Sequence, residues 1–346
     1  MLRRVMVRGL AVAFGAALGL GVGILPALAA DRVVGSRVAS SVSRLAWPEG
    51  HLYVLDTTGA AVYRFPLGAD GLPAAQPDGV LSLVGAQDPQ GMTVDREGHI
   101  FVADDYANVV NEYPAGATGR RLPFSTLLVQ GAPDHLKVDY EGRLYVHRYI
   151  GSIYYIAIYE KGAKGHDAPL NLITADHGNG LMSDYVLSPS GVLYVMDWAV
   201  GVVVYNDPLR HRHPALPSDP DAILLANGGE WETSFWYTLA LDEPADTLYI
   251  QFASRSGYQW NTVNFARRSL RGSSSLVDPL IFNGQCGNQS YSGTNSALVV
   301  KRYLMVSCLP SNNVLVLDKN RFGRRKAVEI LGPPLFTGVS EIAVGP

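Results

Sequence analysis

The sequence predicts an all-β protein, a six-bladed β-propeller whose blades are four-stranded antiparallel sheets. The first observation is a strand motif, typified by HLYVLD, which occurs six times at spacings of 44 to 56 residues. The second is that other strand-like stretches repeat in phase with it. The third is the composition, with 36 Gly, 21 Pro and 17% charged residues in a chain of 346. Short strands at a regular period, separated by turn residues, are typical of propeller blades. The six motifs begin at His51, His99, Arg143, Val192, Thr247 and Tyr303.

An alternating stretch that ends in a polar turn precedes four of the motifs and predicts the first strand of a blade. Asp or Ser followed by Gly or another small residue supplies the turn, since these residues accept local hydrogen bonds and unusual backbone angles. The stretches lie at 91–98, 135–142, 185–191 and 239–246.

Two further strands are expected to complete each blade. A third strand follows the motif, at 61–66, 109–114, 156–161, 202–207 and 314–319. Fourth strands carry a weaker pattern, at 79–85, 125–130, 170–175, 222–227 and 327–332.

One segment is left over at the end of the chain. VSEIAV (339–344) resembles VSRLAW (42–47), which precedes the first motif. We therefore expect it to add a strand that closes the ring. A distorted seventh blade is the alternative.

The first thirty residues have the pattern of a secretory signal peptide. Three arginines within the first eight residues precede an apolar stretch, 10–25, and Ala27-Leu28-Ala29 follows with small residues at the cleavage positions. We expect cleavage after this leader, which makes residues 1–30 a signal peptide and 31–346 a single β-propeller domain. An uncleaved membrane anchor is the alternative, because the apolar stretch is nearly long enough to span a bilayer.

The compartment and the charge limit the partners of the mature chain. A signal peptide predicts a periplasmic or extracellular protein, with no membrane contact after cleavage. The net charge is −3, and the three arginines of the leader leave the rest of the chain more acidic. Because the sequence of the mature chain contains no extended block of basic residues, we expect no nucleic acid partner. We expect a monomer.

The two cysteines of the chain, Cys286 and Cys308, are expected to form a disulfide. An oxidising compartment favours such a bridge. Two buried thiols are the alternative.

The first three blades end in nearly identical phrases: FPLGADG (65–71), YPAGATG (113–119) and YEKGAKG (159–165). These phrases, together with the strands before them, resemble the NHL repeat of secreted bacterial propellers. The resemblance implies the fold more firmly than an activity, because NHL propellers are mostly binding scaffolds and include a minority of enzymes.

The stretch 180–206 is similar to blades of the SMP-30/gluconolactonase family of six-bladed lactonases. That family holds a divalent metal with one Glu, one Asn and one Asp. Aligned on the strand motif, these ligands fall on Ser43, on Ser183 and near Thr238. Hydroxyl groups are poor substitutes for carboxylates around a hard cation. We therefore expect the lactonase metal site to be absent and predict no cofactor. Binding of a divalent cation at the channel mouth is the alternative.

The third and fourth blades carry the residues most suited to catalysis. The loops entering the first strand and leaving the second lie on one face of a propeller, around its channel, where pockets form. His135, Arg148, Asp184 and Asp197 fall in one sector of that face. A base, a fixed cation and carboxylates suit proton abstraction beside a carboxylate group. The alternative is that Arg148 pairs with Asp184 or Asp197 to hold the loops.

Three residues beside this quartet are candidate ligand contacts: His147, Tyr149 and His177. His135 or His147 would act as general base, and Tyr149 as the acid.

Aromatic residues of the fourth to fifth blades form a second candidate site. Trp231, Trp236 and Trp260 fall in or beside long loops, with Glu230 and Glu232 adjacent. Flat rings beside carboxylates suit a sugar-binding rim. Packing of large side chains under long loops is the alternative.

The sequence thus predicts a secreted NHL-type propeller that binds an extracellular polar or carbohydrate-like small molecule on its loop-rich face. One alternative is a lyase or hydrolase acting on an acidic sugar or lactone at the same face. Another is a scaffold whose partner is a protein.

Overall fold

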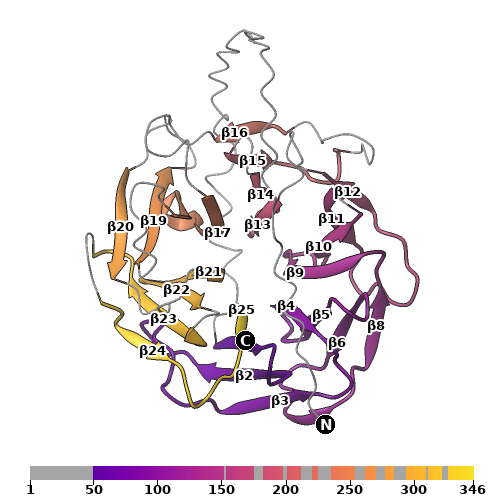
Figure 1. The fold of residues 1–346 in the computed structure, drawn as a ribbon. Helices are drawn as coiled ribbons and strands as arrows, with labels where there is room; N and C mark the ends of the chain where they lie inside the picture. The colour runs from indigo at the N-terminus through magenta and orange to yellow at the C-terminus, as the bar shows by residue number, and fades with distance from the viewer. Residues whose placement is uncertain are drawn as a thin grey trace, which may run out of the picture. The chain divides into compact units, whose positions relative to one another are not determined.

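A computed structural model describes residues 50–151, 153–174, 182–197, 201–211, 220–224, 235–253, 262–269, 277–283, 294–308, 311–321 and 326–346 (Figure 1). All of them belong to one compact unit, Val34–Pro346. Strands dominate this part of the chain, so the predicted all-β class is confirmed. The described residues include no helix with the length and hydropathy needed to cross a membrane.

The described strands form six sheets, numbered here in chain order. The first sheet has the strand order β25 (Val339–Gly345), β1 (His51–Asp56), β2 (Ala61–Pro66), β3 (Gly79–Leu83) and β7 (Gly119–Arg121). The second has the order β4 (Pro89–Val94), β5 (Ile100–Asp104), β6 (Val109–Tyr113) and β8 (Ser125–Leu128). The third has the order β9 (Ala132–Val138), β10 (Leu144–Ile150), β11 (Ile153–Tyr159) and β12 (Asn171–Ile173).

The other three sheets repeat the four-stranded pattern. The fourth has the order β13 (Met182–Leu187), β14 (Leu193–Asp197), β15 (Gly201–Tyr205) and β16 (Ala222–Leu224). The fifth has the order β17 (Phe235–Asp242), β18 (Thr247–Ala253), β19 (Thr262–Ser269) and β20 (Val277–Asn283). The sixth has the order β21 (Thr294–Val300), β22 (Tyr303–Cys308), β23 (Asn313–Asp318) and β24 (Glu329–Leu331).

The first sheet departs from the four-stranded expectation. It gains β25 at one edge and β7 at the other, and β7 runs parallel to β3. The pairing of β7 is short, from Leu81 opposite Gly119 to Leu83 opposite Arg121. A three-residue strand with every residue exposed carries no hydrophobic alternation, so the sequence pattern gave no sign of it.

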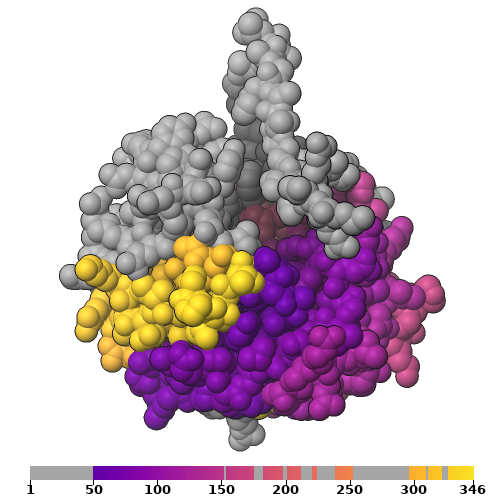
Figure 2. Space-filling view, turned by 60° about the horizontal axis from the view of Figure 1, so that its bottom comes forward, coloured from indigo at the N-terminus to yellow at the C-terminus, as the bar shows by residue number. Residues whose placement is uncertain are grey.

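The last strand closes the ring, as the leftover segment predicted. β25 pairs antiparallel with β1, from His51 opposite Gly345 to Asp56 opposite Val339. Figure 2 shows the C-terminal residues in yellow lying directly against the first strands in indigo. The corresponding segment 42–47 lies outside the described residues.

Alternation along the second strand of each sheet builds the core between neighbouring sheets. In β10, Leu144 and Val146 pack with Ala103 and Val110 of the second sheet. The residue between them, Tyr145, packs instead with residues of the fourth sheet. Successive side chains of a strand point to opposite faces, so each motif is buried on both sides. Full burial of one such side chain contributes about 2 kcal/mol.

The predicted Asp–Gly turns form between the first and second strands. The Asp95 carboxylate accepts hydrogen bonds from the backbone N–H groups of Glu97 and His99, at 2.9 and 2.8 Å. Gly98 completes the turn with a φ of +90°, a conformation that other residues rarely adopt. Asp139 and Gly142 repeat the arrangement in the third sheet.

Candidate functional site

The first strands of the second to sixth sheets, together with β25 of the first sheet, place six side-chain positions in one ring at the centre of the fold. β4, β9, β13, β17, β21 and β25 are the innermost strands in Figure 1 and contact one another around the centre. Two of the six positions, His135 and Asp184, are predicted site residues, and β25 contributes Glu341. The ring consists of Gly91, His135, Asp184, Thr238, Ser296 and Glu341.

Glu341 lies at the centre of a charged network. Its side chain is 1% exposed. Oε1 accepts hydrogen bonds from Ser296 Oγ (2.7 Å) and Lys137 Nζ (3.0 Å), and Oε2 accepts one from His135 Nδ1 (2.8 Å). Burial by itself raises the pKa of this carboxyl, but Lys137 and His135 outweigh it and lower the pKa below its ordinary value. The side chain is therefore a buried carboxylate.

The two cations of this network reach solvent, because His135 and Lys137 are 17% and 23% exposed. Burial favours their neutral forms, but the carboxylates around them outweigh burial. Asp134 and Glu341 are the main causes that raise the pKa of His135 to about 9. Glu341 and Asp184 raise the pKa of Lys137. The channel therefore presents two positive groups held by buried acids.

Gly91 makes this network possible. A Cβ at Gly91 would lie 1.8 Å from the carbonyl oxygen of Asp134 and 3.0 Å from the Cα of His135. Its lack of a side chain lets β4 and β9 approach closely. Glu341 of β25 therefore contacts His135 of β9, although β4 stands between the two strands in the ring.

Asp184 is the second buried acid of the ring, with 3% exposure. Oδ2 accepts hydrogen bonds from Thr238 Oγ1 (2.5 Å) and the Leu239 N–H (2.8 Å), and Oδ1 accepts one from the Tyr185 N–H (2.7 Å). Burial outweighs the nearby cations and raises the pKa of this carboxyl. Asp184 thus ties the fourth sheet to the fifth.

An imidazole–carboxylate pair lies beside the ring. His147 Nδ1 lies 2.5 Å from Asp134 Oδ1, which also accepts the His135 backbone N–H at 2.8 Å. The His147 side chain is 1% exposed, and its other nitrogen, Nε2, has no hydrogen-bond partner among the described residues. The Asp134 side chain is 36% exposed. A carboxylate on one ring nitrogen leaves the other available as an acceptor or donor.

Aromatic rings link this pair to the surface. Tyr149 is 40% exposed, and its ring centroid lies 4.8 Å from that of Tyr154. Tyr154 stacks on His147 at 5.2 Å with an interplanar angle of 7°, and His147 lies 5.8 Å from His135. A line of four rings therefore runs from an exposed tyrosine to the channel.

Arg148 does not join this group, which corrects the predicted catalytic quartet. Strand alternation places it on the face of β10 that carries Val146, opposite His147. It is 3% exposed, and Nη1 donates to Tyr159 Oη at 3.4 Å. Burial lowers its pKa, and it forms no ion pair with a described carboxylate. The alternative pairing with Asp184 or Asp197 is therefore absent as well.

Of the other predicted residues, Asp197 and the backbone of Trp236 belong to the described part of the chain. Asp197 ends β14 opposite Met182 and Gly201, and is 1% exposed. Trp236 belongs to β17, but its side chain is not described. His177, Trp231 and Trp260 lie outside the described residues, as do Glu230 and Glu232.

The predicted disulfide involves one described residue. Cys308 ends β22, is fully buried and is not a free thiol. Cys286 lies outside the described residues, so the bridge between them stays a prediction.

Sequence reasoning missed three members of the site: Asp134, Lys137 and Glu341. Asp134 directly precedes His135, and Lys137 lies two residues after it. Their charges beside a candidate base could have indicated that they belong to the site. Glu341 was missed because the sequence analysis assigned its strand to ring closure and did not predict which of its side chains face the centre.

One group of three potential metal ligands occurs among the described residues: Asp95, Glu97 and His99. Its geometry is that of the turn described above, with His99 Nδ1 at 3.0 Å from Asp95 Oδ2. In the third sheet, Arg143 takes the place of His99 and contacts Asp139 and Glu141. Because a guanidinium fills the equivalent position, the trio is explained as a turn.

Comparisons with known proteins identify the fold. No protein-family model matches the chain, and no curated protein matches it. A structure described as a nidogen/laminin complex is similar with a TM-score of 0.57 and 15% identity, over 85% of this chain and 97% of that one. A protein of unknown function from Bacteroides caccae is similar with a TM-score of 0.54 and 10% identity, over 85% and 98%.

A third likeness names the architecture. The WD40 β-propeller domain of Doa1 is similar with a TM-score of 0.51 and 11% identity, over 84% of each chain. At sequence identities this low, the similarity supports a shared fold but not a shared activity. The ring of sheets and these likenesses together show that the chain folds as a β-propeller.

Proposed function

We propose that this protein is a secreted, six-bladed NHL-type propeller that binds a polar or carbohydrate-like ligand at the channel mouth of its third sheet. Each of the six sheets counts as one blade in this proposal. The observation that carries it is the line of rings from Tyr149 to His135, with Asp134 and Lys137 beside it. Secretion rests on the leader pattern of residues 1–30.

The chemistry of this sector suits a hydroxylated ligand. The exposed face of Tyr149 offers an apolar surface on which a sugar ring stacks. Asp134, at 36% exposure, accepts hydrogen bonds from hydroxyl groups. His135 and Lys137 favour a ligand that also carries a carboxylate, because charge-assisted hydrogen bonds are the stronger ones.

A thermal-shift screen of the full-length chain tests the proposal. The panel contains neutral oligosaccharides and uronic-acid oligosaccharides, and a ligand specific for the folded state raises the melting temperature. The Tyr149→Ala variant is expected to lose the shift, because it removes the exposed ring. Tyr140→Ala is the matched control, since Tyr140 lies in the turn after β9. A shift that survives in Tyr149→Ala, or no shift with any sugar, contradicts the proposal.

A second candidate function is a lyase or hydrolase acting on an acidic sugar or lactone. The Asp134–His147 contact favours it, because a carboxylate on Nδ1 orients an imidazole whose Nε2 is without a partner among the described residues. Turnover of uronic-acid oligosaccharides is the test. His147→Gln and Asp134→Asn should each lower kcat at least about 100-fold, with Tyr140→Ala unchanged. Turnover that survives both substitutions would exclude this dyad.

A third candidate is a protein-interaction scaffold, which the similarity to a structure of a nidogen/laminin complex favours. The exposed Tyr149 side chain would then contact a protein instead of a sugar. Tyr149→Ala would leave every sugar response unchanged but weaken capture of a purified protein partner.

A further inference from the structure

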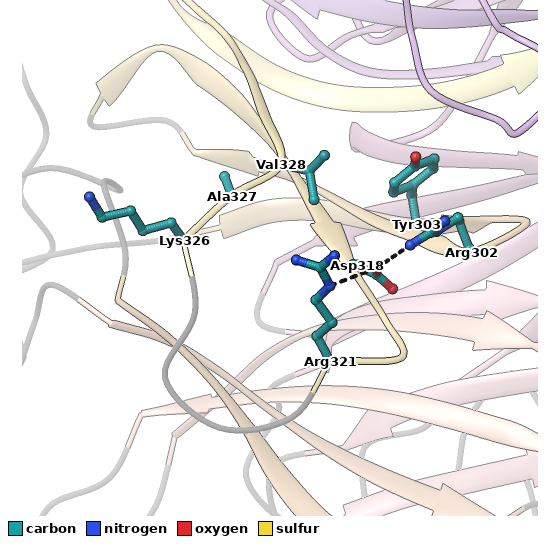
Figure 3. A pocket seen from close by; sticks show the side chains of 7 residues that line it. All are labelled: Arg302, Tyr303, Asp318, Arg321, Lys326, Ala327 and Val328. Atoms are coloured by element: carbon teal, nitrogen blue, oxygen red, sulfur yellow. Dashed lines mark hydrogen bonds and ion pairs between the residues drawn. The ribbon is translucent and has the colours of Figure 1, made fainter.

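A pocket of about 330 Å³ lies on the sixth sheet, away from the ring of inner strands. Figure 3 shows its lining from β22, β23 and the residues on either side of them. Its lining residues are Arg302, Tyr303, Asp318, Arg321, Lys326, Ala327 and Val328.

Positive charge dominates this pocket. Arg302 Nη2 lies 2.5 Å from Asp318 Oδ2, and Arg321 Nε lies 3.3 Å from the same oxygen. The two arginine side chains are 50% and 67% exposed, whereas Asp318 is 3% exposed. In Figure 3 both guanidinium groups approach Asp318, while the Lys326 side chain extends away at the margin. Two arginines thus contact one buried carboxylate, and Lys326 adds a third cation to the lining of the pocket.

The Asp318 carboxylate holds both guanidinium groups and leaves some of their N–H donors available to a ligand. Each arginine contributes one nitrogen to Asp318 and has further N–H donors. A planar fork of donors matches the oxygens of a phosphate group. Asp318 is itself fixed by the backbone N–H of Asn320, which donates to Oδ1 at 3.0 Å.

An apolar wall adjoins these charges. The guanidinium carbon of Arg302 lies 5.5 Å from the centre of the Tyr303 ring, whose hydroxyl donates to Asp70 Oδ2 at 2.9 Å. Val328 is 45% exposed beside Ala327. The volume lies at the lower end of the range for small-molecule sites. It suits a ligand no larger than a phosphorylated monosaccharide.

We propose that this pocket binds the phosphate group of a small phosphorylated molecule, with Arg302 and Arg321 as its ligands and the Ala327–Val328 wall against its organic part. A phosphate group would accept hydrogen bonds from the guanidinium N–H groups that do not contact Asp318. This site is separate from the proposed sugar site on the third sheet.

Isothermal titration calorimetry of the full-length chain tests the proposal with glucose 6-phosphate as the probe. Inorganic phosphate, inorganic sulfate, glucose and glucuronate form the other arms. We expect glucose 6-phosphate to bind more tightly than inorganic phosphate, and glucose not to bind. Equal affinity for glucose 6-phosphate and inorganic phosphate would refute a role for the apolar wall. Equal or tighter binding of sulfate or glucuronate would refute the choice of phosphate.

Single substitutions locate the binding. Arg302→Ala and Arg321→Ala should each weaken glucose 6-phosphate binding at least about tenfold, and each leaves one guanidinium on Asp318. Arg302→Lys serves if Arg302→Ala does not fold, and is expected to weaken binding less. Arg120→Ala is the matched control, because Arg120 is an exposed cation on β7 of another sheet. Absence of binding, unchanged binding in both pocket variants, or equal weakening in the control overturns the proposal.

Discussion

At the scale of single residues, Glu341 collects hydrogen bonds from side chains of two other strands. His135 and Lys137 come from β9, and Ser296 comes from β21. A buried carboxylate with three donors is well compensated, whereas a buried cation without its acid is costly. Loss of Glu341 should therefore weaken both the fold and the positive charge at the channel.

Glu341→Gln is expected to lower the free energy of unfolding by about 2 kcal/mol, because the charge that holds His135 and Lys137 disappears. Urea unfolding measures this loss. Glu329→Gln on β24 is the matched control and should change stability by less than about 0.5 kcal/mol. Equal stability of the two variants would show that the network contributes nothing to folding.

The pKa of His135 predicts how stability depends on pH. In the folded protein it is about 9, above about 6.5 for an unfolded chain. The resulting stabilisation is complete below pH 6.5 and is lost as the pH rises through 9. The free energy of unfolding should thus fall between these values, by up to about 3 kcal/mol.

Urea midpoints measured across this pH range test the prediction. His135→Gln should flatten the decrease, while His166→Gln, at an exposed position, should keep it. A wild-type midpoint that stays constant from pH 6.5 to 9.5 contradicts a paired, protonated His135.

At the scale of elements, the contact between β4 and β9 depends on a missing side chain. Gly91→Ala would place a methyl group 1.8 Å from the Asp134 carbonyl oxygen. Backbone must move to accept it, so we expect a loss of about 3 kcal/mol, near the upper end of overpacking effects. The same movement would separate His135 from Glu341.

Thermal unfolding and the pH profile together check this variant. Gly68→Ala is the control, since its new Cβ would lie 3.1 Å from the Asp70 carboxylate oxygen and at an ordinary contact distance, 3.5 Å, from the Leu72 carbonyl oxygen. A Gly91→Ala protein as stable as Gly68→Ala would mean that the two strands can separate without cost.

At the scale of the whole molecule, closure of the first sheet by β25 joins the end of the described chain to its beginning. Ile342 is 2% exposed and belongs to a core cluster that includes Leu52, Val54 and Met305. This cluster therefore spans the first and sixth sheets. The strength of closure should be visible in the stability of the entire ring.

Ile342→Ala is expected to destabilise the protein by about 3 kcal/mol, through lost burial and the cavity left behind. Ile330→Ala removes the same atoms from β24, where Ile330 is 39% exposed, and should cost less than about 1 kcal/mol. Denaturant unfolding followed by tryptophan fluorescence compares them. Similar losses would argue that β25 is no more important than an outer strand.

The local pattern of the chain predicted most of the strands and their turns. The alternation of apolar and polar side chains located β5, β10 and β22. An Asp followed three residues later by a Gly located the turns at Gly98 and Gly142. Such features depend on neighbours within a few residues. The three-residue β7 escaped prediction because its pairing with β3 depends on backbone contact alone.

The candidate site was only partly predictable. The structure places His135 and Asp184 in the ring of inner strands, and His147 and Tyr149 belong to one line of rings. Arg148 was misplaced because a neighbour of His147 on a strand must point to the other face.

The sequence by itself determined the all-β class, the repeated strands and the turns, because side-chain alternation and turn chemistry act locally. Only the tertiary structure decided which charges meet at the centre. His135 and Glu341 are 206 residues apart and come together because β25 closes the ring and Gly91 leaves the space between them. No local pattern encodes a contact that exists only once the ring is closed.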